Sequence, residues 1–295
     1  MIVYFDNGNW PLLRECFKES GVRHVTPYRS FAFHLADSIT CGKFRLRGYK
    51  YTNPIGPDDD TIIVFDTKVP TDYLIWLCRK YPNRRIILWF WNPLPNARRI
   101  DLIPHKVELW SYSKHDCERF RMRHNTQFYF DSVAQRAAQE PARPWPDTPK
   151  ALFIGRVKHR EHAVLALKEQ LERAGASVEL HLMLDRAHAL GSYERPMPYP
   201  ETIPLLQSAD VLIDIYDDPT AGLSLRVMES IFWNKKLVTD NIQVADEPFY
   251  DPRNIYVLGS DTRDLREFLA EPPVPVSPEI RDYYLLSNWL KRFDE

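Results

Sequence analysis

Cysteine is scarce in this sequence. The four cysteines, Cys16, Cys41, Cys78 and Cys117, are widely spaced in the first half of the chain and form no C-x-x-C pair. A disulfide framework or a cysteine-ligated zinc site needs cysteines paired at short, regular spacings. We therefore expect reduced thiols in a cytosolic protein, with neither a disulfide framework nor a zinc site.

The sequence also has neither an excess of charge of one sign nor a long apolar run. The 39 Lys and Arg residues nearly balance the 40 Asp and Glu residues, so no overall field attracts nucleic acid or an anionic membrane. No apolar run approaches the ~20 residues that span a bilayer, and the N-terminal MIVYFDNGNW lacks the features of a signal peptide. A soluble cytoplasmic protein without a nucleic-acid partner is expected.

The sequence does contain a regular alternation of apolar runs and helical patterns. A chain of 295 residues predicts two domains, and 44% hydrophobic residues suffice for two cores. In the first half, strands are predicted at Ile2–Phe5, Thr61–Phe65, Arg85–Phe90, Val107–Trp110 and Gln127–Phe130, and helices at Trp10–Ser20, Pro70–Tyr81 and Ser113–Phe120. Such alternation predicts a parallel sheet with helices on both faces.

The pattern stops after Asp131 and restarts near Lys150. Four prolines crowd the intervening stretch, which suits an interdomain linker. The second half predicts strands at Ala151–Ile154, Ser177–Leu184, Val211–Ile215, Lys236–Thr239 and Ile255–Leu258, and helices at Arg160–Ala174, Tyr199–Ser208, Leu223–Trp233, Asp261–Leu269 and Glu279–Phe293. We therefore predict an α/β fold of two Rossmann-like parallel-sheet domains, with residues 1–140, a linker 141–149, residues 150–278 and a C-terminal helix in 279–295.

The turn before the helix at Leu223–Trp233 is the best candidate for a ligand site. Ligands of parallel sheets bind at the carboxyl ends of strands, where helix N-termini favour anions. The turn carries Thr220, Gly222 and Ser224, whose backbone amides suit a phosphate, while Arg226 adds a cation and Glu229 a carboxylate for a ribose diol. The alternative is ordinary capping by Thr220 or Ser224, with Arg226 and Glu229 paired on the surface.

A second turn follows the strand at Ala151–Ile154. Gly155 is followed by Arg156, Lys158 and Arg160, and cations around a glycine suit a diphosphate. The G-x-G-x-x-G pattern of dinucleotide sites is absent. A solvated run of charges at the domain edge is the alternative for this turn taken alone.

The segment Gly222-Leu-Ser-Leu-Arg-Val-Met-Glu-Ser-Ile-Phe-Trp-Asn-Lys-Lys-Leu-Val-Thr-Asp240 resembles the nucleotide-sugar segment of GT-B glycosyltransferases, above all bacterial enzymes of lipopolysaccharide, capsule and exopolysaccharide biosynthesis. The resemblance implies that Glu229 binds the ribose and that Gly222, Leu223 and Ser224 bind phosphate. The segment Ile154–Lys158 is similar to the family's G-R-x-x-x-K region, whose cations hold the diphosphate. Ala221 stands where many retaining members have a first glutamate, so inversion or retention stays open.

The resemblance also implies the wider function. The two domains would face a cleft, and the C-terminal helix would pack back toward the N-terminal domain. The protein would transfer a sugar from a nucleotide-sugar to a glycan or lipid-linked acceptor without a metal or cofactor. The alternatives are a non-catalytic module that binds a nucleotide or phosphorylated ligand, and a sugar-nucleotide epimerase of similar fold.

The N-terminal half offers weaker candidates. Asp6 follows the first predicted strand and Asn92 the third, so both are catalytic candidates, with helix capping as the alternative. The aromatic run Trp89–Trp91 suits stacking on sugar rings, or belongs to the core. A basic cluster is formed by Arg98, Arg99, Lys106, Lys114, Arg119, Arg121 and Arg123. It is either a solvated face or a peripheral contact with the inner face of a membrane that carries the acceptor.

Overall fold

The computed structural model describes residues 2–5, 11–25, 51, 55–66, 69–94, 100–156, 159–183, 197–216 and 221–295. The chain divides into two compact units, Met1–Thr126 and Gln127–Glu295. Each unit has its own parallel sheet, so the prediction of two parallel-sheet α/β units is confirmed. Within these described residues no helix is long and apolar enough to cross a lipid bilayer.

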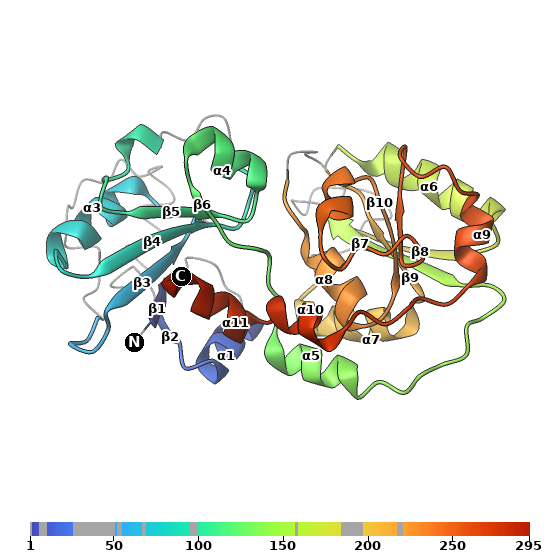
Figure 1. The fold of residues 1–295 in the computed structure, drawn as a ribbon, viewed down its shortest axis with the longest axis horizontal. Helices are drawn as coiled ribbons and strands as arrows, with labels where there is room; N and C mark the ends of the chain where they lie inside the picture. Colours follow the sequence, from blue (N-terminus) through green and yellow to red (C-terminus); the bar gives the residue numbers. More distant parts are fainter. Residues whose placement is uncertain are drawn as a thin grey trace. The chain divides into compact units, whose positions relative to one another are not determined.

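The first unit contains a sheet with strand order β2-β1-β3-β4-β5-β6, in which all pairs are parallel (Figure 1). Its strands are β1 (Ile2–Phe5), β2 (Arg23–Val25), β3 (Thr61–Phe65), β4 (Arg85–Phe90), β5 (Glu108–Ser111) and β6 (Arg123–His124). Its helices include α1 (Pro11–Glu19), α3 (Thr71–Lys80), the 3-10 turn η1 (Ile100–Leu102) and α4 (Lys114–Phe120). Helix α3 buries Leu74 and Leu77 against one face of β3 and β4, and Phe17 of α1 meets Phe65 on the other face.

The second unit has the strand order β11-β10-β9-β7-β8, again with every pair parallel. Its strands are β7 (Lys150–Arg156), β8 (Ser177–Met183), β9 (Val211–Asp214), β10 (Lys236–Thr239) and β11 (Ile255–Val257). Its main helices are α5 (Asp131–Ala138), α6 (Glu161–Arg173), α7 (Tyr199–Ser208), α8 (Leu225–Phe232) and α9 (Leu265–Ala270), with the 3-10 turn η2 at Ile242–Asp246. Helices α6 and α9 cover one face of the sheet, while α7 and α8 pack on the strands from the other (Figure 1).

The prediction of a strand at Gln127–Phe130 is wrong. The sixth strand of the first sheet is the short β6, and residues 127–130 belong to the second unit instead. There the Tyr129 amide donates to the Tyr284 carbonyl at 2.7 Å, and the Leu286 amide donates to the Tyr129 carbonyl at 2.8 Å. Phe128 lies 4.6 Å from Trp289 between ring centroids. The apolar run is therefore buried by the C-terminal segment, which lies more than 150 residues later in the sequence.

The expected domain boundary also differs from the structure. Residues 131–138, which follow the apparent end of the pattern, form α5, and the units divide after Thr126 rather than after residue 140. Helix α5 buries Val133, Ala134 and Ala137 and packs on α8. Small alanine side chains give a weak apolar signal, which explains why this helix was missed. Residues 141–149 form neither helix nor strand.

The single C-terminal helix predicted at Glu279–Phe293 is divided in the structure. Helix α10 (Pro278–Tyr283) ends before Leu285, which pairs with Tyr129, and α11 (Leu286–Lys291) follows with the 3-10 turn η3 (Arg292–Asp294). The Asp131 carboxylate accepts hydrogen bonds from the Ser287 amide and hydroxyl at 3.1 and 2.5 Å, which caps the start of α11. The pairing with residue 129 interrupts the helix. Packing of this segment toward the N-terminal unit stays a prediction.

Candidate functional site

The candidate site lies at the carboxyl edge of the second sheet. Strand β7 is the first strand of this sheet, and its neighbours are β8 on one side and β9 on the other. The direction of winding therefore reverses between β7 and β9, which is where ligands of open α/β sheets bind. Arg156 ends β7 and Asp214 ends β9, so charged groups occupy the two strand ends at this reversal.

Ser224 connects the end of β9 with the start of α8. Its hydroxyl oxygen accepts hydrogen bonds from the Arg226 and Val227 amides at 3.0 and 3.3 Å, as expected of an N-cap. The same hydroxyl donates to the Asp214 carboxylate at 2.7 Å. The Ser224 amide donates to the Tyr216 hydroxyl at 2.8 Å. Strand end, cap and helix start are therefore held in one hydrogen-bond network.

Arg226 and Glu229 form an ion pair inside the unit rather than on its surface. The side chains of Arg226 and Glu229 are only 13% and 2% exposed, and the guanidinium Nη1 donates to the Glu229 carboxylate. Arg226 Nη2 also donates to the Ile154 carbonyl at 3.1 Å, which joins the start of α8 to β7. A buried ion pair with additional hydrogen bonds fixes the position of both groups. The prediction that Ser224 caps the helix is correct. The prediction that Arg226 and Glu229 pair on the surface is wrong, because this face of α8 points into the unit.

Burial raises the pKa of the Asp214 and Glu229 carboxyls above their ordinary values. For Asp214, the hydrogen bond from Ser224 and the charges of Arg226 and Arg160 oppose this rise. For Glu229, the charge of Arg226 is the largest opposing effect. The neighbouring guanidinium groups therefore favour the charged forms of both carboxyls, and a change at any of these arginines alters the electrostatics of the site.

Arg160 links the second turn to the same edge. Its Nε donates to the Arg156 carbonyl at 3.0 Å, and its Nη1 donates to the Ile215 carbonyl beyond β9. Gly155 permits this approach, because an added Cβ would lie 3.0 Å from the Phe153 ring and 3.1 Å from Arg160 Nη2. The turns after β7 and β9 are therefore brought together, as their sequences indicated.

The structure describes most of the predicted residues around this edge. Gly222 and Leu223 are buried just before the cap, Arg156 is exposed, and Gly155, Ser224 and Arg226 are partly exposed. Lys158 and Thr220 lie outside the described residues. Asp240 adds a carboxylate at the end of β10, where it accepts a hydrogen bond from the Tyr216 amide at 2.9 Å.

Sequence reasoning missed two tyrosines that surround Glu229. Tyr199 lies close enough to the Glu229 carboxylate to lower its pKa, and the Tyr199 hydroxyl is 3.1 Å from the Tyr129 hydroxyl. Tyr129 in turn accepts a hydrogen bond from Trp233 Nε1 at 2.7 Å. Burial raises the pKa of both tyrosines above the ordinary value, so the network carries neutral hydroxyls. No local pattern predicts these contacts, since the residues come from three separate segments.

The candidates in the first unit differ from those of the second. Asp6 lies outside the described residues, and Asn92 is exposed after β4. Trp89 and Phe90 are fully buried. They belong to the core, and the prediction that they stack on sugar rings is wrong. Trp91 is partly exposed, and its ring meets Phe65 edge-on at 5.5 Å.

The basic cluster of the first unit is partly described. Lys106 Nζ donates to the Tyr81 carbonyl at 3.0 Å. Arg123 stacks over the Trp110 ring at 4.2 Å and pairs with Glu108. Arg98 and Arg99 lie outside the described residues. These contacts occupy some of the cations, and membrane association stays a prediction.

Comparison with known proteins finds weak likenesses. No family model matches the chain, and no curated protein matches it by sequence. The solved glycosyltransferase of kitacinnamycin is 11% identical, with 99% of this chain and 90% of that chain covered, at a TM-score of 0.40. The NAD⁺-bound 3-phosphoglycerate dehydrogenase of Entamoeba histolytica is 10% identical, with 100% and 93% covered, at a TM-score of 0.24. Scores this low identify neither the family nor the function of the chain.

Proposed function

We propose that the protein is a glycosyltransferase of the GT-B type, which transfers a sugar from a nucleotide-sugar to a glycan or lipid-linked acceptor without a bound metal. The nucleotide part binds at the carboxyl edge of the second sheet. Gly155, Arg156 and Lys158 contribute from the turn after β7. The turn before α8 and its first residues contribute Thr220, Gly222, Leu223, Ser224, Arg226 and Glu229.

The observation that carries this proposal is that the cationic turn after β7 and the start of α8, which carries Arg226, meet at the reversal point of the sheet. Arg160 bonds from one turn to the carbonyl of Ile215 in the other, and Arg226 bonds back to Ile154 of β7. A diphosphate at this point meets guanidinium groups from both sides and the N-terminal end of α8. As the glycosidic bond to the sugar breaks, negative charge grows on the leaving diphosphate, and prepositioned cations stabilise it without a metal.

Glu229 is proposed to bind the ribose, and the structure adds a condition to that role. Its carboxylate is buried, accepts a hydrogen bond from Arg226 and lies near Tyr199. Ribose binding therefore includes a local exchange of partners, in which Arg226 turns from the carboxylate to the diphosphate and the ribose hydroxyls take its place. After this exchange Arg226 pairs with the diphosphate, and the Glu229 carboxylate is held by hydrogen bonds from the neutral ribose hydroxyls.

The first test measures binding of a nucleoside diphosphate and of the corresponding nucleoside by calorimetry. Arg156→Ala removes a charge-assisted contact of ~1.5–3 kcal/mol, so the diphosphate should bind roughly ten- to hundredfold more weakly while the nucleoside is little affected. Arg173→Ala is the matched control, since Arg173 lies at the far end of α6. Equal losses for both ligands, or an equal loss in the control, would contradict the phosphate assignment.

The second test separates transfer from binding alone. Consumption of the nucleotide-sugar only when an acceptor glycan is added supports transfer. Consumption without an acceptor indicates an epimerase, and binding without consumption indicates a non-catalytic module.

A third test concerns ribose binding. The Glu229→Gln variant should narrow the difference in affinity between a ribose nucleotide and a 2′,3′-dideoxyribose nucleotide, because a neutral amide accepts hydrogen bonds more weakly than a carboxylate. An unchanged difference removes Glu229 from the ribose site.

A further inference from the structure

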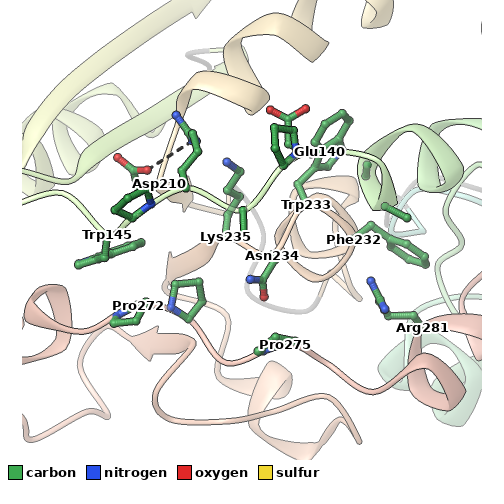
Figure 2. Close-up of a pocket in the computed structure, with 17 residues that line it drawn as sticks. Glu140, Trp145, Asp210, Phe232, Trp233, Asn234, Lys235, Pro272, Pro275 and Arg281 are labelled. Atoms are coloured by element: carbon green, nitrogen blue, oxygen red, sulfur yellow. Dashed lines mark ion pairs between the residues drawn. The ribbon is translucent and has the colours of Figure 1, made fainter.

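A second feature lies at the amino edge of the same sheet, away from the carboxyl edge. It is a pocket of about 280 Å³, lined by Asp210 and Lys235, which directly precede β9 and β10. The end of α5, the proline-rich residues 141–145, the end of α8 and prolines of 272–275 complete the lining (Figure 2). The pocket and the proposed nucleotide site therefore lie at opposite ends of α8.

Polar groups make up the larger part of the pocket surface, and stiff rings supply its apolar part. These rings belong to Pro141, Pro144, Trp145, Phe232, Trp233, Pro272, Pro273 and Pro275. Proline rings restrict the backbone, so these walls lose little freedom when a ligand binds. Trp145 is fixed by a hydrogen bond from its Nε1 to the Leu269 carbonyl at 2.8 Å, and Phe232 stacks on Tyr129 at 4.6 Å between centroids. The pocket can therefore accept a flat or short apolar group.

The carboxylates of the lining already have partners. Asp210 accepts a hydrogen bond from the Lys150 amide at 2.8 Å and pairs with Arg143 at 3.5 Å. Glu140 accepts from the Gln207 side-chain amide at 2.7 Å. The charge of Asp210 is therefore balanced by Arg143, and the single charge of Glu140 stands against the two further cations of the lining, Lys235 and Arg281.

Two cations of the lining have donors to spare. Lys235 Nζ donates to the Gln207 carbonyl at 3.2 Å, which uses one of its three protons. The guanidinium of Arg281 forms no hydrogen bond or ion pair with any residue that the structure describes. Figure 2 shows Lys235 and Asn234 between Trp145 on one side and Arg281 on the other. Positive charge and hydrogen-bond donors thus remain available beside the apolar walls.

The environment of Lys235 favours a bound anion. The residue is only 8% exposed, and burial lowers the pKa of its ammonium group to about 8. The nearby charge of Arg143 lowers this pKa further, while Asp210 and Glu140 act in the opposite direction. A negative group next to the ammonium would offset the cost of keeping it charged away from water.

We propose that this pocket binds a small organic anion, with a carboxylate or phosphate held by Arg281 and Lys235 and an apolar body against Trp145 and the prolines. The volume lies just below the range of drug-sized ligand pockets, so the ligand has about one ring or a short acyl chain. Such a ligand contacts the end of α8 without touching the proposed nucleotide site. The proposal stands independently of the glycosyltransferase function.

The test uses ligand-observed NMR titrations of the full chain with phenyl phosphate, phenylacetate and neutral benzyl alcohol. At least one anion should bind, and the alcohol should bind much more weakly. The two anions distinguish a phosphate from a carboxylate head group. Equal binding of all three probes, or binding of none, overturns the proposal.

Variants locate the binding. Arg281→Gln and Lys235→Met should each weaken the preferred anion roughly ten- to hundredfold, since each removes a charge-assisted contact. Arg136→Gln on the neighbouring α5 and Arg156→Ala at the nucleotide site are matched controls and should have no effect. If Arg156→Ala weakens the anion and the pocket variants do not, the anion binds at the other site and the proposal is wrong.

The dependence on pH gives a separate readout. Because Lys235 loses its proton as the pH rises through about 8, anion affinity should fall above that pH. The fall should be absent in Lys235→Met and retained in Arg281→Gln. A pH profile that is identical in wild type and Lys235→Met would overturn the role of this lysine.

Discussion

The two units of this protein have the same arrangement of their first three strands but differ at the carboxyl edge. In each sheet the first strand lies between the second and the third, as β2-β1-β3 and as β8-β7-β9. In the first unit, β3 ends in Phe65, which packs on Phe17 and Trp91, and Asp66 accepts the Trp91 amide at 3.0 Å. Among the residues that the structure describes, aromatic rings pack around that strand end.

In the second unit the equivalent strand end carries charges. Asp214 ends β9, and its carboxylate bonds to Ser224 beside Arg226 and Arg160. The shared topology creates an edge suited to ligands in both units, but only the residues at the strand ends decide what binds there. The predictions that follow compare matched residues of the two units.

The largest effect is expected from removing a buried carboxylate. Glu229→Ala leaves Arg226, 13% exposed, without its partner, whereas Asp59→Ala in the first unit leaves Arg23, 40% exposed and able to reach water. Breaking a buried ion pair costs about 3–5 kcal/mol, and losing a partly exposed one costs less. Urea denaturation should therefore show a clearly greater loss for Glu229→Ala. Equal losses would mean that Arg226 finds water or another partner.

A smaller effect is expected from the two serine N-caps. Ser113 caps α4 by accepting the Asp116 amide, and Ser224 caps α8. Removing a cap costs about 1 kcal/mol in either unit. Ser224→Ala also removes the hydrogen bond to buried Asp214, which adds about 1–3 kcal/mol. Denaturation of Ser224→Ala and Ser113→Ala measures the difference, and equal costs would show that the bond to Asp214 contributes little.

The sequence predicted the strands of the second unit and the meeting of the turns that follow β7 and β9. This succeeded because buried parallel strands are continuous apolar runs, and chain order places their carboxyl ends on one edge. It did not predict that Glu229 faces inward to Arg226, or that Tyr199 and Tyr129 surround it. Those contacts depend on how α7, α8 and the segment before α5 pack, and no local pattern encodes that packing. The prediction of a strand at residues 127–130 is wrong for the same reason, since the segment pairs with the chain near residue 285.

The smallest effect on stability is expected at two glycines that precede charged side chains. In Gly56→Ala the new Cβ meets the Asp59 carboxylate at an ordinary 3.5 Å. In Gly155→Ala it lies 3.0 Å from Phe153 and 3.1 Å from Arg160, so those side-chain ends must shift by a few tenths of an ångström. The strain is about 1 kcal/mol, and the gain from a less flexible unfolded chain offsets most of it.

Nucleotide binding should nevertheless separate these two alanine variants. Gly155→Ala displaces the guanidinium of Arg160, which bonds to the turn after β9, so a nucleoside diphosphate should bind severalfold more weakly. Gly56→Ala leaves the second sheet untouched and should bind as wild type does. Calorimetry on both variants, alongside their denaturation curves, checks whether affinity changes without a matching change in stability. If Gly155→Ala binds normally, the position of Arg160 does not contribute to the site, and the turn after β7 acts through Arg156 and Lys158 alone.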